Sequence, residues 1–214
     1  MKKILAFLVA IAVSATLFMG TSMAATTNTG TVTLTSGNLN VRAAASSTAT
    51  IIGKLANGSQ ITLISSTNGY YQINFSGKTG YVSTKYVVNN QAKTVVNTAK
   101  TTIGVKYVYG GATMSGFDCS GLVVYCYAKV GMTLPHQSGL QSKLGTFVNR
   151  ADLRLGDLVF FDTNGGNDAI NHVGVYAGNG MVIEAQSGLG KVAEISLTNS
   201  FWSSAYMTAR RILV

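Results

Sequence analysis

The spacing of apolar residues changes near residue 90, and this change divides the chain into two folding units. Before it, Tyr71–Phe75 alternates apolar and polar side chains with a period of two, which predicts a strand. After it, apolar residues recur at the spacing of one helix face, at Ala92, Val95, Val96, Ala99 and Ile103. The join at residues 89–91 is only a few residues long, so we expect the two units to have little freedom to move relative to each other.

The first unit, residues 30–88, consists of strand candidates separated by polar turns. Thr79–Val82 follows Tyr71–Phe75 across the turn Ser76-Gly77-Lys78. The other candidates, bounded by glycines at 53, 58, 69, 77 and 80, are Leu39–Val41, Ile51-Ile52 and Ile61–Ile64. Five or so strands without a helical pattern predict a small all-β barrel. Its tyrosines, Tyr70, Tyr71 and Tyr81, either line a groove or fill the core, and the core is the expectation for each taken singly.

The second unit, residues 92–214, has helices first and strands after, which predicts an α+β arrangement. One helix begins at Cys119 and ends at Gly131, and its apolar face comprises Leu122, Val123, Cys126 and Val130. Strands are then expected at Leu158–Phe161, His172–Ala177, Met181–Ala185, Val192–Ile195 and Met207–Leu213.

Residues 1–25 have the pattern of a secretion signal. A basic start at Lys2-Lys3 is followed by the apolar run Ile4–Phe18 and a cleavage site at Ser22-Met23-Ala24. The run is short for a membrane-spanning helix, which needs about 20 apolar residues, and no cysteine follows it for lipid attachment. We therefore expect a protein that is secreted, or located in the cell wall, with no stable membrane anchor.

The charge is uneven along the chain. The net charge is +9, from 16 basic and 7 acidic residues, yet residues 30–88 contain no acidic residue and all seven acids lie at or after Asp118. A basic, non-acidic segment on an exported protein suits a polyanionic neighbour such as a cell wall polymer or a membrane surface. No run of lysine and arginine is present, so we expect no nucleic acid partner. A basic but passive surface is the alternative.

The two cysteines are not expected to form a disulfide. Cys119 and Cys126 lie seven residues apart, which places them two turns apart and roughly 10 Å along the axis if one helix carries both. Bridged cysteines need Cα atoms within about 7 Å. Cys126 is therefore interpreted as core, and Cys119 is left as a free thiol.

Cys119 and His172 together predict nucleophilic catalysis. A free cysteine has a pKa near 8.5, so only about 3% is thiolate at pH 7. A helix N-terminus and a neighbouring imidazolium both raise this fraction, and Asp118 is a plausible N-cap for a helix that begins at Cys119. Ser120 keeps the first turn small, so that a substrate carbonyl can approach. His172, on a later strand, would take the thiol proton and pass it to the departing amine.

An imidazole base needs a polar group on its other nitrogen, and Glu184 is the candidate. His172 and Glu184 lie on two strands joined by the loop Gly178-Asn179-Gly180. Because side chains alternate faces, the two residues share a face only when the loop has an odd number of residues. A two-residue turn would separate them, and an exposed strand carboxylate is the alternative for Glu184.

Several motifs carry a resemblance to known families. Residues 92–214 resemble the NlpC/p60 family of papain-like cell-wall cysteine peptidases through Tyr107–Gly111, Asp118–Gly121, Gly156–Phe161 and His172–Tyr176. Residues 30–88 resemble bacterial SH3-like cell-wall modules through Leu39–Arg42, Gly69–Ile73 and Gly77–Val82. The expected architecture is a small all-β SH3-like barrel followed by an α+β papain-like catalytic domain.

The resemblance implies cleavage of peptidoglycan stem peptides, usually between D-glutamate and a diamino acid. It implies that Cys119 is the nucleophile, His172 the base and Glu184 the third polar residue. It further assigns Tyr107 to the oxyanion site, Asp118 and Ser120 to the amino end of the stem peptide, and Ser138 to a substrate subsite. Two histidines and two cysteines at these spacings match no zinc pattern, and we expect no metal and no cofactor.

The chain departs from the family pattern at two positions beside the expected site. Glu184 stands where histidine is usual, and His136 leads a stretch where arginine is usual. No acidic residue lies near His136 in sequence, so it is interpreted as a subsite or surface residue. Two alternatives stay open: a papain-like amidase or acyltransferase with another substrate, and a non-catalytic wall-binding protein.

Overall fold

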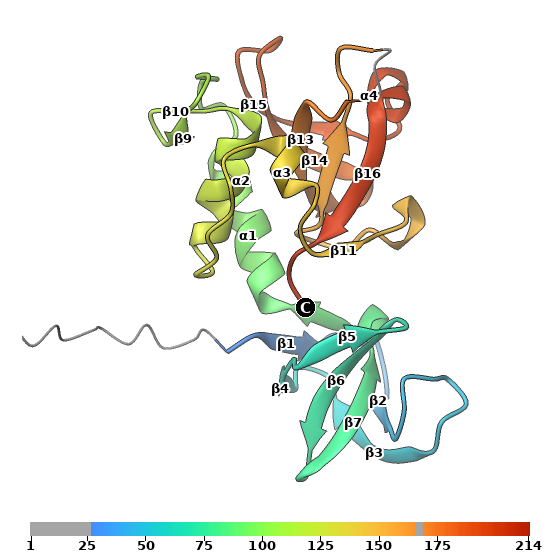
Figure 1. Ribbon diagram of the computed structural model, residues 1–214. Helices are drawn as coiled ribbons and strands as arrows, with labels where there is room; N and C mark the ends of the chain where they lie inside the picture. Colours follow the sequence, from blue (N-terminus) through green and yellow to red (C-terminus); the bar gives the residue numbers. More distant parts are fainter. Residues whose placement is uncertain (1–26, 166–168) are drawn as a thin grey trace, which may run out of the picture.

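The computed structural model describes residues 27–165 and 169–214 as two stacked parts, a β-rich part and a larger α+β part (Figure 1). The predicted signal at residues 1–25 lies outside the described residues. Within those residues, no helix is both long enough and apolar enough to cross a membrane.

The β-rich part has more strands than the sequence predicts. Its elements are β1 (Thr29–Val32), β2 (Asn38–Arg42), β3 (Ile51–Ala56), β4 (Gln60–Thr62), β5 (Ser65–Thr67), β6 (Tyr70–Phe75), β7 (Lys78–Ser83), the 3-10 turn η1 (Thr84–Tyr86) and β8 (Val87–Asn89). They form two antiparallel sheets, with orders β4-β1-β8 and β3-β2-β7-β6-β5, rather than one closed barrel. The strands β1, β5 and β8 were missed because each is only three or four residues long.

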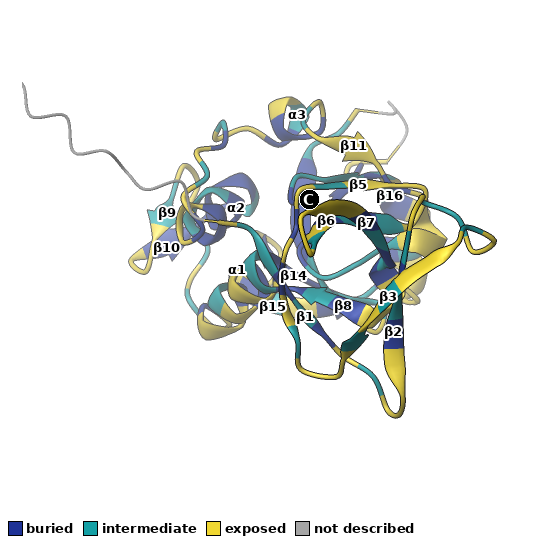
Figure 2. Cartoon of the chain, turned by 90° about the horizontal axis from the view of Figure 1, so that it is seen from below, coloured by how far each residue is buried: buried dark blue, intermediate teal, exposed yellow. Residues whose placement is uncertain are grey.

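The core of this part lies between the two sheets and includes Val32, Val41 and Tyr71. Figure 2 shows the sheets curving around it, with exposed residues on the outside. Tyr71 is 3% exposed, as expected for a core residue. Tyr70 and Tyr81 are only half-buried, because successive residues of a strand point to opposite faces and the outer face is open. The core prediction is therefore correct for one of the three tyrosines.

The two parts are joined without a linker. β8 ends at Asn89, and helix α1 (Asn90–Thr101) begins at the next residue. The Asn89 side chain caps this helix by accepting hydrogen bonds from the backbone N–H groups of Gln91 and Ala92. The predicted apolar face of α1 is buried up to Ala99. Ile103 lies beyond the end of the helix and is 47% exposed, so its placement on that face was wrong.

Further contacts hold the two parts together. The Asn89 side-chain amide donates to the backbone carbonyl of Val214, whose side chain packs against the core of the β-rich part. Arg154 of the second part and Tyr71 of the first line the same hollow between the two parts. These contacts, together with the direct join, fix the orientation of the two parts.

The α+β part contains a six-stranded sheet. After α1 come β9 (Ala112–Thr113), β10 (Gly116–Phe117), α2 (Cys119–Ala128), α3 (Ser138–Gln141), β11 (Thr146–Phe147), the 3-10 turn η2 (Arg150–Asp152), β12 (Leu158–Phe161), β13 (His172–Gly178), β14 (Met181–Gln186), β15 (Lys191–Ser196), α4 (Ser200–Ala205) and β16 (Tyr206–Arg211). The sheet order is β11-β16-β12-β13-β14-β15, and the pairings are antiparallel. All five strands predicted after residue 157 are present, within two residues at each end.

Both faces of this sheet are covered, which explains why β12 is apolar throughout. Leu158 and Phe160 pack into the cluster that contains α1 and α2, whereas Val159 and Phe161 pack with Trp202 of α4 on the other face. The N-terminus of α2 and the start of β13 both lie at the end of the sheet farthest from β1–β8 (Figure 1). The fold thus brings Cys119 and His172 to the same end of the molecule.

Candidate active site

Helix α2 begins at Cys119 because Asp118 caps it. Asp118 has an extended backbone (φ −94°, ψ 177°), and its Oδ1 accepts hydrogen bonds from the Gly121 N–H at 2.7 Å and the Ser120 hydroxyl at 3.1 Å. Gly121 is required here, since an added Cβ would lie 2.0 Å from the carbonyl oxygen of Gly111. The capped, tightly packed first turn holds the Cys119 thiol at the positive end of the helix.

His172 lies between Cys119 and Glu184. Its Nε2 is 2.8 Å from Glu184 Oε2, and on its other side the ring shares a hollow with Cys119, close enough for the two side chains to interact. Burial by itself lowers the pKa of His172, but hydrogen bonds with and electrostatic attraction by Cys119 and Glu184 raise it to about 9. The imidazole is therefore charged at neutral pH, which is the form that stabilises a thiolate.

Glu184 is fully buried, not exposed on the strand. Its Oε2 meets His172, and its Oε1 has no hydrogen-bond partner among the described residues. A buried carboxylate with one ionisable partner depends on that partner for its charge compensation. The His172–Glu184 pair therefore behaves as one unit, and it is further enclosed by the ring of Trp202, whose centroid is 5.6 Å from that of His172.

A bulge places His172 and Glu184 on the same face. The hairpin closes through a two-residue turn at Asn179-Gly180, both with positive φ, and Gly178 pairs with Met181. That turn alone would put the two side chains on opposite faces. Between Tyr176 and Gly178, however, the register shifts by one residue, because Ala177 is left without a partner. The extra residue restores the odd count that the sequence argument required.

Glycine opposite Glu184 provides the space for this carboxylate. The shifted register sets Gly174 against Glu184, and a Cβ on Gly174 would lie 3.0 Å from Glu184 Cβ and 2.4 Å from Val182 Cγ1. Side chains two residues apart on a strand point to the same face of the sheet. His172, two residues before Gly174, therefore lies on the face that carries Glu184.

Two hollows flank Cys119 and share Tyr107 and Asn171. The Asp118 hollow, about 340 Å³, is lined by Tyr107, Tyr109, Gly110, Asp118, Cys119, Ser120, His136, Gln137, Ser138 and Asn171. The Trp202 hollow, about 380 Å³, is lined by Tyr107, Cys119, Thr163, Asn164, Asn171, His172, Gln186, Ser187, Gly188, Phe201 and Trp202. No residue of β1–β8 lines either hollow. A chain-like substrate can therefore cross Cys119 with one half in each hollow.

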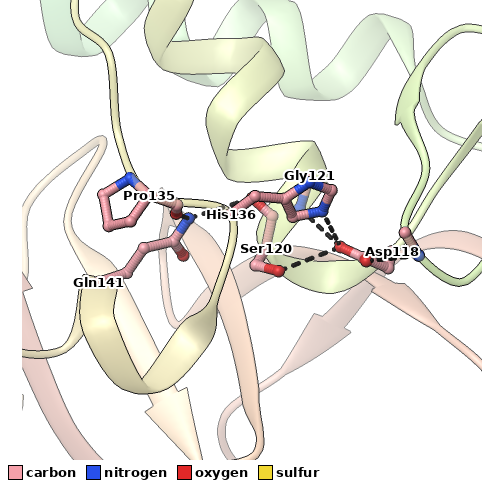
Figure 3. Close-up of polar contacts among 7 residues, drawn as sticks. Asp118, Ser120, Gly121, Pro135, His136 and Gln141 are labelled. Carbon is pink, nitrogen blue, oxygen red and sulfur yellow. Dashed lines mark hydrogen bonds and ion pairs between the residues drawn. The ribbon is translucent and has the colours of Figure 1, made fainter.

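Asp118 also organises the Asp118 hollow (Figure 3). His136 Nε2 lies 2.9 Å from Asp118 Oδ1, and the backbone N–H of Gly110 donates to Oδ2 at 2.8 Å. Burial raises the pKa of Asp118, but hydrogen bonds from Gly121, His136 and Gly110 outweigh it and hold the pKa below its ordinary value. The hollow thus contains a carboxylate that stays charged at neutral pH, next to the imidazole of His136.

Gln141 holds the loop that carries His136. Its side-chain amide donates to the carbonyl oxygens of Ser120 at 3.1 Å and Pro135 at 2.8 Å (Figure 3). The sequence argument left His136 without an acidic partner because Asp118 lies 18 residues earlier in the chain. The structure corrects this: the turn after α2 returns the chain to the helix N-terminus.

Tyr107 is positioned by backbone contacts on both sides. Its N–H donates to the carbonyl oxygen of Gly190 at 2.8 Å, and it bridges Phe117, two residues before Cys119. Burial, followed by the negative charges of Cys119 and Asp118, raises the pKa of the Tyr107 phenol, so its hydroxyl keeps its proton and can donate it in a hydrogen bond.

The structure brings all the predicted site residues together. Cys119, His172 and Tyr107 line the hollows, Asp118, Ser120 and Ser138 line the Asp118 hollow, and Glu184 lies behind His172. The sequence argument offered His136 as a subsite residue without its partner Asp118, and it missed the contributions of Tyr109, Asn171, Gln141, Gln186, Phe201 and Trp202. The one usable signal was position: Asn171 directly precedes His172 in sequence.

Comparison with known proteins gives matches for both parts. A family model described as the NlpC/P60 family matches residues 104–211, and one described as a bacterial SH3 domain matches residues 37–88. A solved structure, an NlpC/P60 family protein from Bacillus cereus, is similar with a TM-score of 0.55 and 26% identity, covering 88% of this chain and 64% of that one.

Curated relatives are peptidases. The gamma-D-glutamyl-L-lysine dipeptidyl-peptidase of Bacillus cereus is 35% identical over 135 residues, which are 63% of this chain and 40% of the relative. The probable endopeptidase NlpC of Escherichia coli is 40% identical over 110 residues, which are 51% of this chain and 70% of the relative. A probable endopeptidase NlpC homolog from Haemophilus influenzae is 39% identical over 112 residues, which are 52% of this chain and 57% of the relative. The chain therefore spans only about half the length of the first relatives that it matches.

Proposed function

The chain belongs to the NlpC/P60 family, and on that premise we propose that it is a secreted peptidoglycan endopeptidase that cleaves stem peptides through a Cys119 acyl-enzyme. The observation that carries the proposal is the position of His172, which is hydrogen-bonded to buried Glu184 and lines the same hollow as Cys119 at the start of α2. Relatives named as a murein DD-endopeptidase of Escherichia coli and a peptidoglycan endopeptidase of Mycobacterium tuberculosis supply the substrate class.

The reaction proceeds in two steps. The Cys119 thiolate attacks the scissile carbonyl carbon and forms a carbon–sulfur bond, and the imidazolium of His172 gives its proton to the departing amine as the carbon–nitrogen bond breaks. Water then gives a proton back to His172 as its oxygen bonds to the thioester carbon. The carbon–sulfur bond breaks, which releases the carboxylic acid and restores the Cys119 thiolate beside the His172 imidazolium. Atoms and charges therefore balance over the cycle.

The oxyanion that forms in each step has donors in place. The Asp118 carboxylate accepts a hydrogen bond from the Gly121 N–H, and the Asp118 backbone carbonyl accepts one from the Leu122 N–H. The first-turn N–H groups of Cys119 and Ser120 have no partner inside the helix and can donate to the oxyanion. Tyr107 lines both hollows, and its hydroxyl supplies a further donor.

The two hollows suggest how a stem peptide is oriented. The Asp118 hollow offers a carboxylate and the hydroxyls of Ser120 and Ser138, which suit the free ammonium and amide groups at the amino end of a stem peptide. The diamino acid and its extension then occupy the Trp202 hollow, which is lined mainly by uncharged side chains. We place the scissile bond after D-glutamate in this orientation, in keeping with the gamma-D-glutamyl-L-lysine unit in the name of the Bacillus cereus relative.

The test is the mass spectrum of muropeptides released from purified peptidoglycan. The unmodified chain should generate new stem-peptide termini, and Cys119→Ala should generate none. Cys126→Ala is the matched control, because it removes the other thiol of the same helix, which is buried and distant from the hollows. Equal products from the unmodified and Cys119→Ala proteins would end the thiol mechanism, and sugar-chain fragments alone would indicate a glycosidase.

A further inference from the structure

The β-rich part carries a hollow that the peptidase chemistry does not use. We name it the basic groove and define it by Asn38, Asn40, Arg42, Tyr70, Lys85 and Tyr86, which line its floor and walls. Its volume is about 830 Å³, more than twice that of either hollow beside Cys119. A hollow of this size on a small sheet structure has room for several units of a polymer.

Two cations share the groove without a counter-charge. Arg42 and Lys85 both line it, and no acidic residue does. The chain has no aspartate or glutamate before Asp118, so nothing in the β-rich part offsets them. Arg42 Nη1 donates to the carbonyl oxygen of Ala49 at 2.8 Å, but a guanidinium has five N–H donors, and the Lys85 side chain is exposed. An anion is the ligand that this arrangement lacks.

The other groups in the groove suit a polyol. Tyr70 presents its ring on the outer face of β6, opposite the core-facing Tyr71, and Tyr86 is 46% exposed. Aromatic faces of this kind pack against C–H groups, and their hydroxyls stay in water. The amides of Asn38 and Asn40 can both donate and accept, as alternating hydroxyl groups require.

We propose that the basic groove binds an anionic wall polymer built of polyol units joined by phosphodiesters. Arg42 and Lys85 take the phosphates, Asn38 and Asn40 the hydroxyls, and the tyrosines the carbon backbone. A stem peptide fits less well, because the groove has no carboxylate for the ammonium of a diamino acid. The proposal goes beyond the proposed peptidase activity and does not depend on whether Cys119 cleaves peptidoglycan.

The position of the groove gives this binding a role. No residue of β1–β8 lines the hollows beside Cys119, and the two parts are joined without a linker. The chain can therefore hold one wall polymer while a stem peptide lies across Cys119. Binding in the groove is expected to set where on the wall the peptidase acts, without changing the chemistry of the site.

The test measures binding of the full chain with Cys119→Ala, so that no cleavage interferes, to soluble poly(glycerol phosphate). The groove variant, Arg42→Gln with Lys85→Gln, should bind at least about tenfold more weakly, and the slope of log K against log salt should fall by roughly 1.4 for two lost phosphate contacts. The matched control is Lys54→Gln with Lys78→Gln, which removes the same charge from the same part outside the groove. It should bind within threefold of the parent.

Three results would overturn the proposal. Equal losses in the groove variant and the control would show unspecific attraction to a basic surface. Peptidoglycan stripped of phosphodiester polymers serves as a second ligand. If the groove variant loses binding to this stripped peptidoglycan but still binds poly(glycerol phosphate), the groove belongs to a peptide or glycan. Unchanged binding by Lys85→Gln alone, which breaks no described hydrogen bond and so keeps the fold, would remove the lysine from the site. Soluble-peptide cleavage by the unmodified chain is measured separately, so a failure of the peptidase mechanism stays distinguishable.

Discussion

Replacing Glu184 with glutamine removes one negative charge from behind His172 and leaves the shape of the site nearly unchanged. Burial alone lowers the pKa of His172, whereas Cys119 and Glu184 raise it from 6.5 to about 9. At 1.36 kcal/mol per pKa unit, the imidazolium is stabilised by roughly 3 kcal/mol. A hydrogen bond to a charged partner contributes about 1.5–3 kcal/mol, so Glu184→Gln should lower kcat/KM at pH 7 roughly tenfold to 150-fold.

The pH profile gives the sign of the effect. Because the pKa of His172 is raised, the charged imidazole persists as pH rises and is lost near pH 9, which sets the high-pH limb of kcat/KM. In Glu184→Gln this limb should move toward neutral pH. The assay is hydrolysis of a soluble stem peptide from pH 5 to 10, with Glu194→Gln as control, since Glu194 is an exposed glutamate on the neighbouring strand β15. A rate within twofold and an unmoved limb would refute the reasoning and leave Glu184 a passive buried group.

Three further perturbations test other parts of the account. Tyr107→Phe should lower kcat roughly 100-fold with little change in KM if the hydroxyl donates to the oxyanion, and a change confined to KM in steady-state kinetics would assign it to substrate binding. Gly174→Ala places a Cβ 2.4 Å from Val182 Cγ1 and 3.0 Å from Glu184 Cβ, so urea unfolding should show a loss of about 1–3 kcal/mol; an unchanged midpoint would contradict the close packing. Burial raises the pKa of Asp118, but its hydrogen bonds lower it more, so the pKa lies below 3.8. The charged Asp118 therefore stabilises the folded protein above pH 3.8, and this contribution is lost as pH falls through the lowered pKa. Thermal unfolding should therefore show Asp118→Asn less stable than the parent at pH 7, with the difference shrinking as pH falls below 3.8, and a constant difference would be inconsistent with this linkage.

The parts of the site that depend on local chemistry could be predicted from the sequence. A helix that begins at Cys119 follows from Asp118 as its N-cap, because capping acts within three residues, and the cap hydrogen bond to Gly121 is present. The strands that carry His172 and Glu184 follow from their apolar runs. The order of helices and strands was enough to place Cys119 and His172 in one α+β unit.

What the sequence left open depends on register and on distant contacts. The shared face of His172 and Glu184 rests on a bulge at Ala177, which the strong turn signal at Asn179-Gly180 conceals. The pair of Asp118 and His136 joins residues 18 apart, and no local pattern marks it. The sequence did not predict strands β1 and β8, because these short segments are strands through their pairing with each other rather than through their composition.

The most direct test of the central claim is the rate at which iodoacetamide alkylates Cys119 at pH 6.5, read by peptide mass spectrometry in the parent and in His172→Ala. The account predicts that Cys119 reacts at least about tenfold faster in the parent, because the charged imidazole stabilises the thiolate. Cys126 serves as the internal control, since burial raises its pKa to about 12 and it should stay unmodified in the folded protein. Equal rates for Cys119 in the two proteins would contradict the account.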